Sequence, residues 1–104
     1  MKKTWINQSA GTYIETYPNG MKCWFLNGKL HRTDVDETGV SLPAVEYANG
    51  DKYWYVNDKL HHTDGPAVER ANGETRYYIN NKHIPQLDNK RIYGEDLAKL
   101  LVLL

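Results

Sequence analysis

The chain has 104 residues, with 13 basic and 13 acidic side chains and a formal net charge of zero. This length supports one domain with a modest core, so we expect residues 1–104 to form a single domain. The balanced charge excludes the basic surplus of a typical nucleic-acid binder, and it also excludes an acidic mimic of nucleic acid.

The N-terminal stretch MKKTWINQSAGTY has no apolar region behind its lysines, so we expect no signal peptide there. No apolar run in the chain approaches the roughly 20 residues that a membrane span needs. The single cysteine, Cys23, has no partner for an internal disulfide, which favours a reducing compartment. We therefore expect a cytoplasmic protein without a membrane partner.

Three stretches of the chain repeat one another, and each opens with Asn-Gly. They read NGMKCWFLNGKLHRTD from Asn19, NGDKYWYVNDKLHHTD from Asn49 and NGETRYYINNKHIPQL from Asn72. The second and third begin 23 residues apart, and the first is longer because of an insertion within VDETGVSL. We therefore predict cap strands over 1–18, followed by hairpin repeats of about 23 residues over 19–48, 49–71 and 72–87.

Two turns are expected in each repeat. Asn-Gly between alternating residues indicates a two-residue hairpin turn in which both positions have positive φ. Such a turn at Asn49-Gly50 predicts Val45 opposite Trp54, and the same register later predicts two further pairs, Glu69 with Arg76 and Val68 with Tyr77. The second turns are expected at Asn27-Gly28, Asn57-Asp58 and Asn80-Asn81. These signals predict a mainly β protein, built as an antiparallel β-meander.

The alternation of side chains along the strands separates two faces of the sheet. The predicted core face carries Trp24, Leu26, Trp54, Val56, Tyr77 and Ile79, joined by Val45 and Val68. The other face carries Phe25, Tyr55 and Tyr78, with Tyr53 and Arg76 beside them. Tryptophan, tyrosine and arginine dominate the energetically important positions of protein interfaces. We therefore expect these five residues of the second face to bind a partner or ligand.

The last segment, residues 92–104, predicts a short C-terminal helix. Glu95 and Asp96 suit a helix N-terminus, and the leucines after them recur with helical spacing. The last turn is apolar all round, and a helix end of this kind is usually buried. It could cover the Phe25, Tyr55 and Tyr78 face or contact a second subunit. The expected contacts in a homo-oligomer are Leu100, Leu101, Leu103 and Leu104.

The pattern W-[FY]-x-N-[GD]-K-L-H-x-T-D, followed by G-P-A-V-E and Asn-Gly, resembles the short hairpin repeats of bacteriophage and large-DNA-virus proteins. These repeats are similar to the MORN repeat. Residues 24–34 and 43–64 carry the likeness, and residues 65–81 match more loosely. The resemblance implies a binding scaffold rather than a catalyst. It also implies a small phage-type accessory protein in the host cytoplasm, which inhibits or modulates a host protein such as a defence factor.

Candidate groups for catalysis or metal binding are few. Four histidines could in principle hold zinc, but His61 and His62 are adjacent and would point to opposite faces of an extended strand. His31 and His61 fill the same position in successive repeats. His61 with Asp64 could form a general acid–base pair, yet no nucleophile motif or phosphate loop accompanies it. We therefore predict no catalytic residue, no metal site and no cofactor. The fourth histidine, His83, is likewise expected to bind no metal.

A protein-binding module is thus the expected function, with a host protein as the partner. The alternative is a sponge that sequesters a nucleotide or cyclic nucleotide between aromatic side chains. In that case Arg32, Arg70 and Arg76 would meet the phosphates. Binding to a lipid surface or to single-stranded nucleic acid is a further alternative, although zero net charge counts against nucleic acid.

Overall fold

The computed structural model describes residues 1–104 and shows a mainly β protein with one C-terminal helix, as predicted. The strands are β1 (Lys2–Asn7), β2 (Thr12–Thr16), β3 (Lys22–Leu26), β4 (Lys29–Leu30), β5 (Val45–Glu46), β6 (Lys52–Tyr53), β7 (Tyr55–Val56), β8 (Lys59–Leu60), β9 (Val68–Glu69), β10 (Thr75–Arg76), β11 (Tyr78–Ile79) and β12 (Lys82–His83). A 3-10 turn at Pro85–Leu87 and the helix α1 (Gly94–Leu103) follow.

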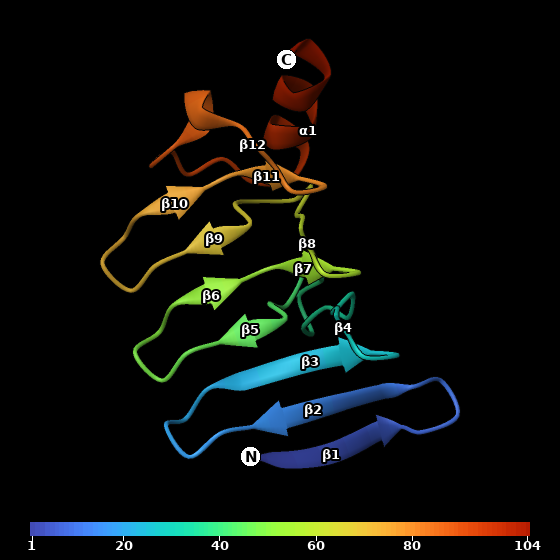
Figure 1. The fold of residues 1–104 in the computed structure, drawn as a ribbon. Helices are drawn as coiled ribbons and strands as arrows, with labels where there is room; N and C mark the ends of the chain where they lie inside the picture. Colours follow the sequence, from blue (N-terminus) through green and yellow to red (C-terminus); the bar gives the residue numbers. More distant parts are fainter.

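The hairpins are stacked in chain order, from β1 at one end of the molecule to β12 and α1 at the other (Figure 1). The main sheet has the order β1-β2-β3-β5-β6-β9-β10, and neighbouring strands are antiparallel. β4 pairs with the second half of β3, while β7–β8 and β11–β12 form separate hairpins. The chain is therefore an antiparallel meander in which each long strand changes its partner along its length.

A tryptophan lies where the long strand changes partner. The N–H of Trp24 donates to the carbonyl of Ala44 at 2.8 Å, on the side of β5. The carbonyl of Trp24 accepts from the N–H of His31 at 3.0 Å, on the side of β4. Trp54 makes the equivalent two bonds in the next predicted repeat, at 2.8 and 3.1 Å. The backbone of the predicted repeat is thus held by the same hydrogen bonds in its first two copies.

The turns at Asn19-Gly20, Asn49-Gly50 and Asn72-Gly73 have three residues rather than two, so the predicted register is wrong by one position. The N–H of Tyr47 donates to the carbonyl of Asp51 at 2.9 Å, which leaves Ala48, Asn49 and Gly50 in the loop. Only Gly50 has a positive φ, of 100°. The side-chain oxygen of Asn49 instead accepts from the N–H of Asp51 at 2.9 Å. The asparagine therefore stabilises a type I turn followed by a glycine bulge.

The corrected register moves two valines to the other face of the sheet. Val45 lies opposite Tyr53 and Cys23 rather than Trp54. Because directly opposite residues share a face, Val45 and Val68 lie on the face of Cys23, opposite the tryptophans. The expected pairs Glu69–Arg76 and Val68–Tyr77 are replaced by Glu69–Thr75 and Val68–Arg76. Buried residues consequently lie on both faces, and the prediction of one core face was wrong.

The second set of turns is confirmed as two-residue turns with positive φ. The φ angles are 50° and 82° at Asn27 and Gly28, 50° and 66° at Asn57 and Asp58, and 49° and 69° at Asn80 and Asn81. Asparagine and aspartate tolerate this left-handed conformation better than other residues with a side chain. The two kinds of turn lie at opposite ends of the hairpins (Figure 1).

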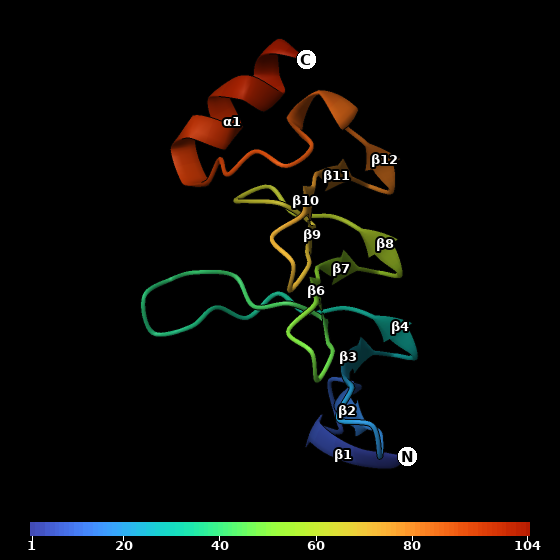
Figure 2. The same ribbon diagram turned by 90° about the vertical axis from the view of Figure 1, so that its left-hand side faces the viewer.

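The helix α1 packs on Tyr77 and not on the face that carries Tyr78. Leu97 is fully buried and forms a small core with Tyr77 and Leu87. Leu100 and Leu101 pack against the same core. Figure 2 shows α1 on the same side of the stack as the long segment between β4 and β5, while β4, β8 and β12 project to the other side. The expectation that α1 could cover the Phe25, Tyr55 and Tyr78 face was therefore wrong.

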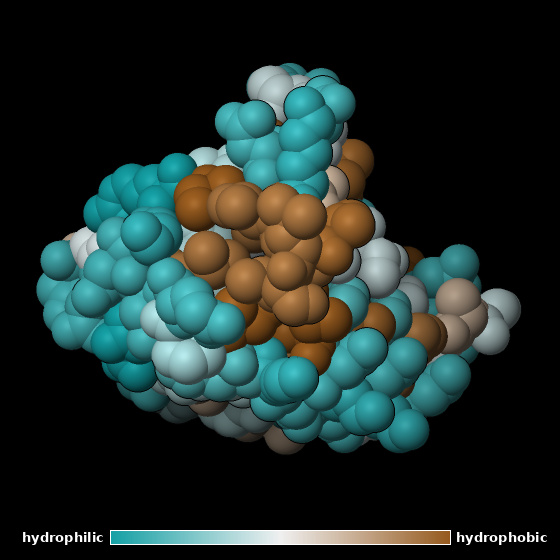
Figure 3. All heavy atoms as spheres, turned by 90° about the horizontal axis from the view of Figure 1, so that it is seen from above, coloured by the Kyte–Doolittle hydropathy of each residue, from teal (hydrophilic) through white to brown (hydrophobic).

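The end of α1 stays exposed. Val102, Leu103 and Leu104 are 84%, 81% and 59% exposed. Apolar atoms gather in one patch on the end of the molecule that carries the helix (Figure 3). Contact of Leu103 and Leu104 with a second subunit stays a prediction, whereas Leu100 and Leu101 already have partners within the chain. No helix has the length and apolar character needed to cross a membrane.

Candidate functional site

Five aromatic residues, which we call the aromatic row, lie on the strands of one side of the sheet: Trp5, Tyr13, Phe25, Tyr55 and Tyr78. Tyr13 stacks on Phe25 with ring centroids 5.1 Å apart, and Trp5 meets Tyr13 edge-on at 5.1 Å. Trp5 remains 44% exposed. Sequence reasoning missed Trp5 and Tyr13, although their alternation with neighbours in the two cap strands was a usable signal.

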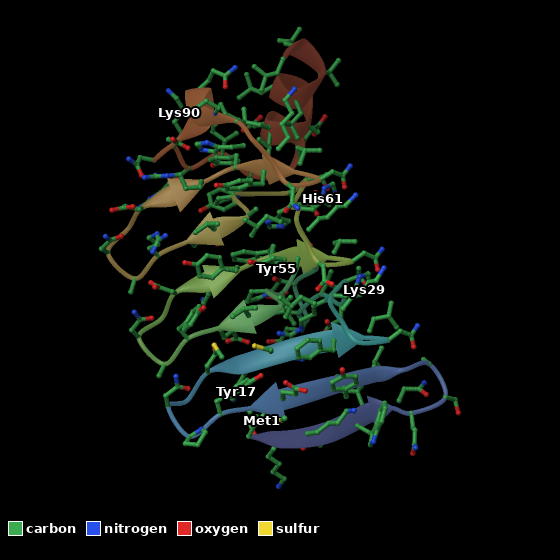
Figure 4. The ribbon with its side chains drawn as sticks, viewed as in Figure 1. Met1, Tyr17, Lys29, Tyr55, His61 and Lys90 are labelled. Atoms are coloured by element: carbon green, nitrogen blue, oxygen red, sulfur yellow. The ribbon has the colours of Figure 1, made fainter.

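Tyr55 and Tyr78 hold the later positions of the row. Tyr55 is half-buried opposite Leu60 in the β7–β8 hairpin, and burial raises the pKa of its hydroxyl. Figure 4 shows Tyr55 near the middle of the stack. Tyr78 stacks on His83, with ring centroids 5.0 Å apart. Because α1 packs on the opposite face, these rings keep an uncovered edge to solvent.

Tyr53 is half-buried and packs within the sheet. It lies directly between Val45 and Val68 in the register of the sheet, and both valines are buried. The Tyr47 ring meets it edge-on at 5.6 Å, and the Arg70 guanidinium lies 6.0 Å from its centroid. Tyr53 is therefore a half-buried member of a local cluster rather than a free side chain.

The three arginines expected to meet phosphates are paired with carboxylates. Arg32 contacts Asp34 at 2.8 Å, Arg76 contacts Glu74 at 3.3 Å, and Arg70 contacts Glu74 at 3.8 Å. A phosphate would have to compete with these partners in order to bind. Arg76, which we expected in the binding set, is thus placed beside its predicted neighbours but is already paired.

The histidines connect one predicted repeat to the next. Nδ1 of His31 accepts from the N–H of Asn57 at 3.1 Å, and Nδ1 of His61 accepts from the N–H of Asn80 at 3.0 Å. His61 lies on the side of the stack that carries the two-residue turns (Figure 4). Each of these bonds uses Nδ1, so this ring nitrogen is not free for a metal ion. No group of three His, Cys, Asp or Glu side chains lies close enough together to hold a metal ion.

His62 has a different environment from the other histidines. Its ring stacks on Trp54 with centroids 4.9 Å apart and an interplanar angle of 5°. Nδ1 lies 2.8 Å from the carbonyl of Pro66, which can only accept, so Nδ1 carries the proton. Nε2 is buried without a hydrogen-bond partner. Burial lowers the pKa of the His62 imidazole, so the neutral ring is the form that the fold accommodates.

This lowered pKa predicts that the protein loses stability in mild acid. Below pH ~6.5 the unfolded chain protonates His62 while the folded chain does not, so the unfolded state binds more protons. We expect the free energy of unfolding to fall between pH 7.5 and 5.5, with a slope from this group of at most about 1.4 kcal/mol per pH unit. Urea unfolding at the two pH values measures the loss, and His62→Gln should reduce it. Equal losses in both proteins would contradict the assignment.

No family model, curated protein or solved structure matches the chain. The geometry of the candidate site offers an uncovered aromatic sheet face, histidines engaged in structural hydrogen bonds, and a buried Cys23 whose thiol pKa is raised by burial. His61 and Asp64 form no ion pair, and Asp34 contacts Arg32 instead of His31.

Proposed function

We propose that this protein is a non-enzymatic protein-binding module whose aromatic row contacts a partner protein. The observation that carries the proposal is that α1 packs on Tyr77 and not on the opposite face, where Phe25, Tyr55 and Tyr78 are only half-buried. Aromatic side chains with a polar tip supply large contact areas at low cost in conformational entropy. The stacked hairpins present them over an extended surface, which suits a protein partner better than a small ligand.

The setting that we propose is that of a small phage-type accessory protein, which inhibits or modulates a host protein in the host cytoplasm. Its support is the likeness of residues 24–34 and 43–64 to short MORN-like hairpin repeats. The hydrogen bonds of Trp24 and Trp54 recur in the first two predicted repeats, which agrees with a repeat scaffold. Nucleotide capture is the less favoured alternative, because Arg32, Arg70 and Arg76 are already paired with carboxylates.

The experiment is an affinity capture that compares the wild type with two variants. Tyr55→Ala removes one ring of the aromatic row, whereas Val35→Ala trims an exposed side chain in the loop on the far side of the sheet. Proteins retained by the wild type and by Val35→Ala, but not by Tyr55→Ala, are the specific partners. With a purified partner, Tyr55→Ala should weaken binding by about 30-fold or more, as expected at an interface hot spot.

Thermal unfolding of each variant separates loss of contact from loss of fold. Tyr55→Ala should stay folded at the temperature of the capture, because Tyr55 is only half-buried. If every retained protein binds Tyr55→Ala and the wild type equally well, the aromatic row is not the binding face.

A further inference from the structure

In the first predicted repeat an internal guanidinium group joins two carboxylates. The guanidinium of Arg32 lies 3.8 Å from the centroid of the Trp24 ring. Its Nε contacts Asp34 at 2.8 Å, and its Nη1 contacts Glu46 at 3.4 Å. Nη1 also donates to the carbonyl of Pro43 at 3.0 Å. Only 12% of the Arg32 side chain is exposed, so the charge is largely enclosed by these partners.

The second predicted repeat keeps every partner of this arrangement but replaces the cation. Trp54, Pro66, Asp64 and Glu69 stand where the first copy has Trp24, Pro43, Asp34 and Glu46. His62 takes the place of Arg32. It stacks on the equivalent tryptophan, Trp54, and its Nδ1 bonds the carbonyl of the equivalent proline, Pro66. The imidazole is neutral and shorter than an arginine side chain. Asp64 and Glu69 consequently form no ion pair, whereas Asp34 and Glu46 both do.

A hollow of about 430 Å³ lies beside the His62 ring. Its lining includes His62, Asp64, Glu69 and Tyr93, together with residues 39–41 of the loop between β4 and β5. Figure 2 shows that loop and α1 on the same side of the sheet. The hollow therefore lies between the loop and the start of the helix, on the face opposite the aromatic row.

Two details distinguish this hollow from a chance gap. Gly65 stands where the first copy has Leu42, and a Cβ on Gly65 would lie 3.0 Å from Cδ1 of Tyr93. The glycine thus allows the Tyr93 ring, which is 48% exposed, to approach the site. Lys52 lies across from both Glu46 and Glu69 in the sheet and pairs with neither. Lys52 therefore does not replace the missing cation in the second copy.

We propose that this hollow binds the guanidinium group of an arginine side chain from a partner beside His62, where it would pair with the two carboxylates that lack the internal cation of the first repeat. Asp64 and Glu69 provide the negative charge, and an arginine matches carboxylates with paired N–H donors. The exposed ring of Tyr93 adds the face on which a guanidinium stacks. The site lies on the other face of the sheet, so this proposal does not depend on partner binding by the aromatic row.

The test uses N-acetyl-L-arginine amide as the probe, followed by two-dimensional NMR of the folded protein. We expect saturable shifts at the Trp54 indole N–H and at the amides of Tyr93 and Gly94. N-acetyl-L-citrulline amide has nearly the same shape without the charge, and it should cause no saturable shift. N-acetyl-L-lysine amide should bind several-fold more weakly. Equal binding of citrulline amide would overturn the charge argument, and equal binding of lysine amide would overturn the guanidinium assignment.

Two variants make the test specific to the site. His62→Arg rebuilds the arrangement of the first repeat, so the internal guanidinium should occupy the site and weaken probe binding at least tenfold, with Tm unchanged or raised. Glu69→Gln should also weaken binding, without any rebuilt contact. The reciprocal change, Arg32→His, should open a second site and add saturable shifts at the Trp24 indole N–H. Wild-type affinity in both His62→Arg and Glu69→Gln would show that the probe binds elsewhere.

Discussion

Tyr77→Ala is expected to lower the free energy of unfolding by about 3–5 kcal/mol, the usual loss when a large buried aromatic residue is truncated. Tyr77 is only 1% exposed and forms the contact between the sheet and α1. Its hydroxyl donates to the carbonyl of Lys90 at 2.9 Å and accepts from the N–H of Ile92 at 2.9 Å. For a chain of this size the change should lower Tm by roughly 12 °C or more in a thermal scan.

Tyr78→Ala is the matched control for this prediction. It removes the same atoms from the neighbouring residue, which lies on the uncovered face and is only half-buried. We expect a loss of about 1 kcal/mol, typical of a substitution outside the core. Urea unfolding of both variants gives the comparison. A larger loss for Tyr78→Ala than for Tyr77→Ala would contradict the packing of α1 on the face that carries Tyr77.

The fold class could be predicted from the sequence, but the length of one turn could not. Asn-Gly suits two turns: a two-residue turn in which both residues have positive φ, and a three-residue turn in which only glycine does. Asn27-Gly28 adopts the first and Asn49-Gly50 the second. The choice depends on whether the asparagine side chain accepts the N–H two residues later, as Asn49 does. That one-residue difference transferred Val45 to the other face.

The face that carries the aromatic side chains could be predicted from the sequence, while their role in binding stays a prediction. The aromatic positions Phe25, Tyr55 and Tyr78 follow from the period of two in the repeats, and the structure places them as expected. The hollow beside His62 could not be predicted, because it depends on contacts between segments far apart in the chain. Alignment of the repeats showed that His62 replaces Arg32. It did not show that Arg32 joins two carboxylates, which is what makes the replacement informative.

Leu97→Ala is expected to lower the free energy of unfolding by about 2–5 kcal/mol, as for other fully buried leucines. Leu97 has no exposed surface and packs with Tyr77 and Leu87. Leu103→Ala is the control in the same helix: its side chain is 81% exposed, so the loss in a dilute sample should stay within about 0.5 kcal/mol. Both variants make the same chemical change within α1.

The dependence of Tm on protein concentration tests whether the exposed leucines of α1 contact a second subunit. If Leu103 and Leu104 contact a second subunit, the Tm of the wild type should rise with concentration, and the Leu103→Ala variant should lose that rise. The effect of Leu97→Ala should be the same at every concentration, because its partners belong to the same chain. Equal losses for the two variants in dilute solution would mean that the exposed side of α1 holds the helix in place. That result would contradict the core of Tyr77, Leu87 and Leu97.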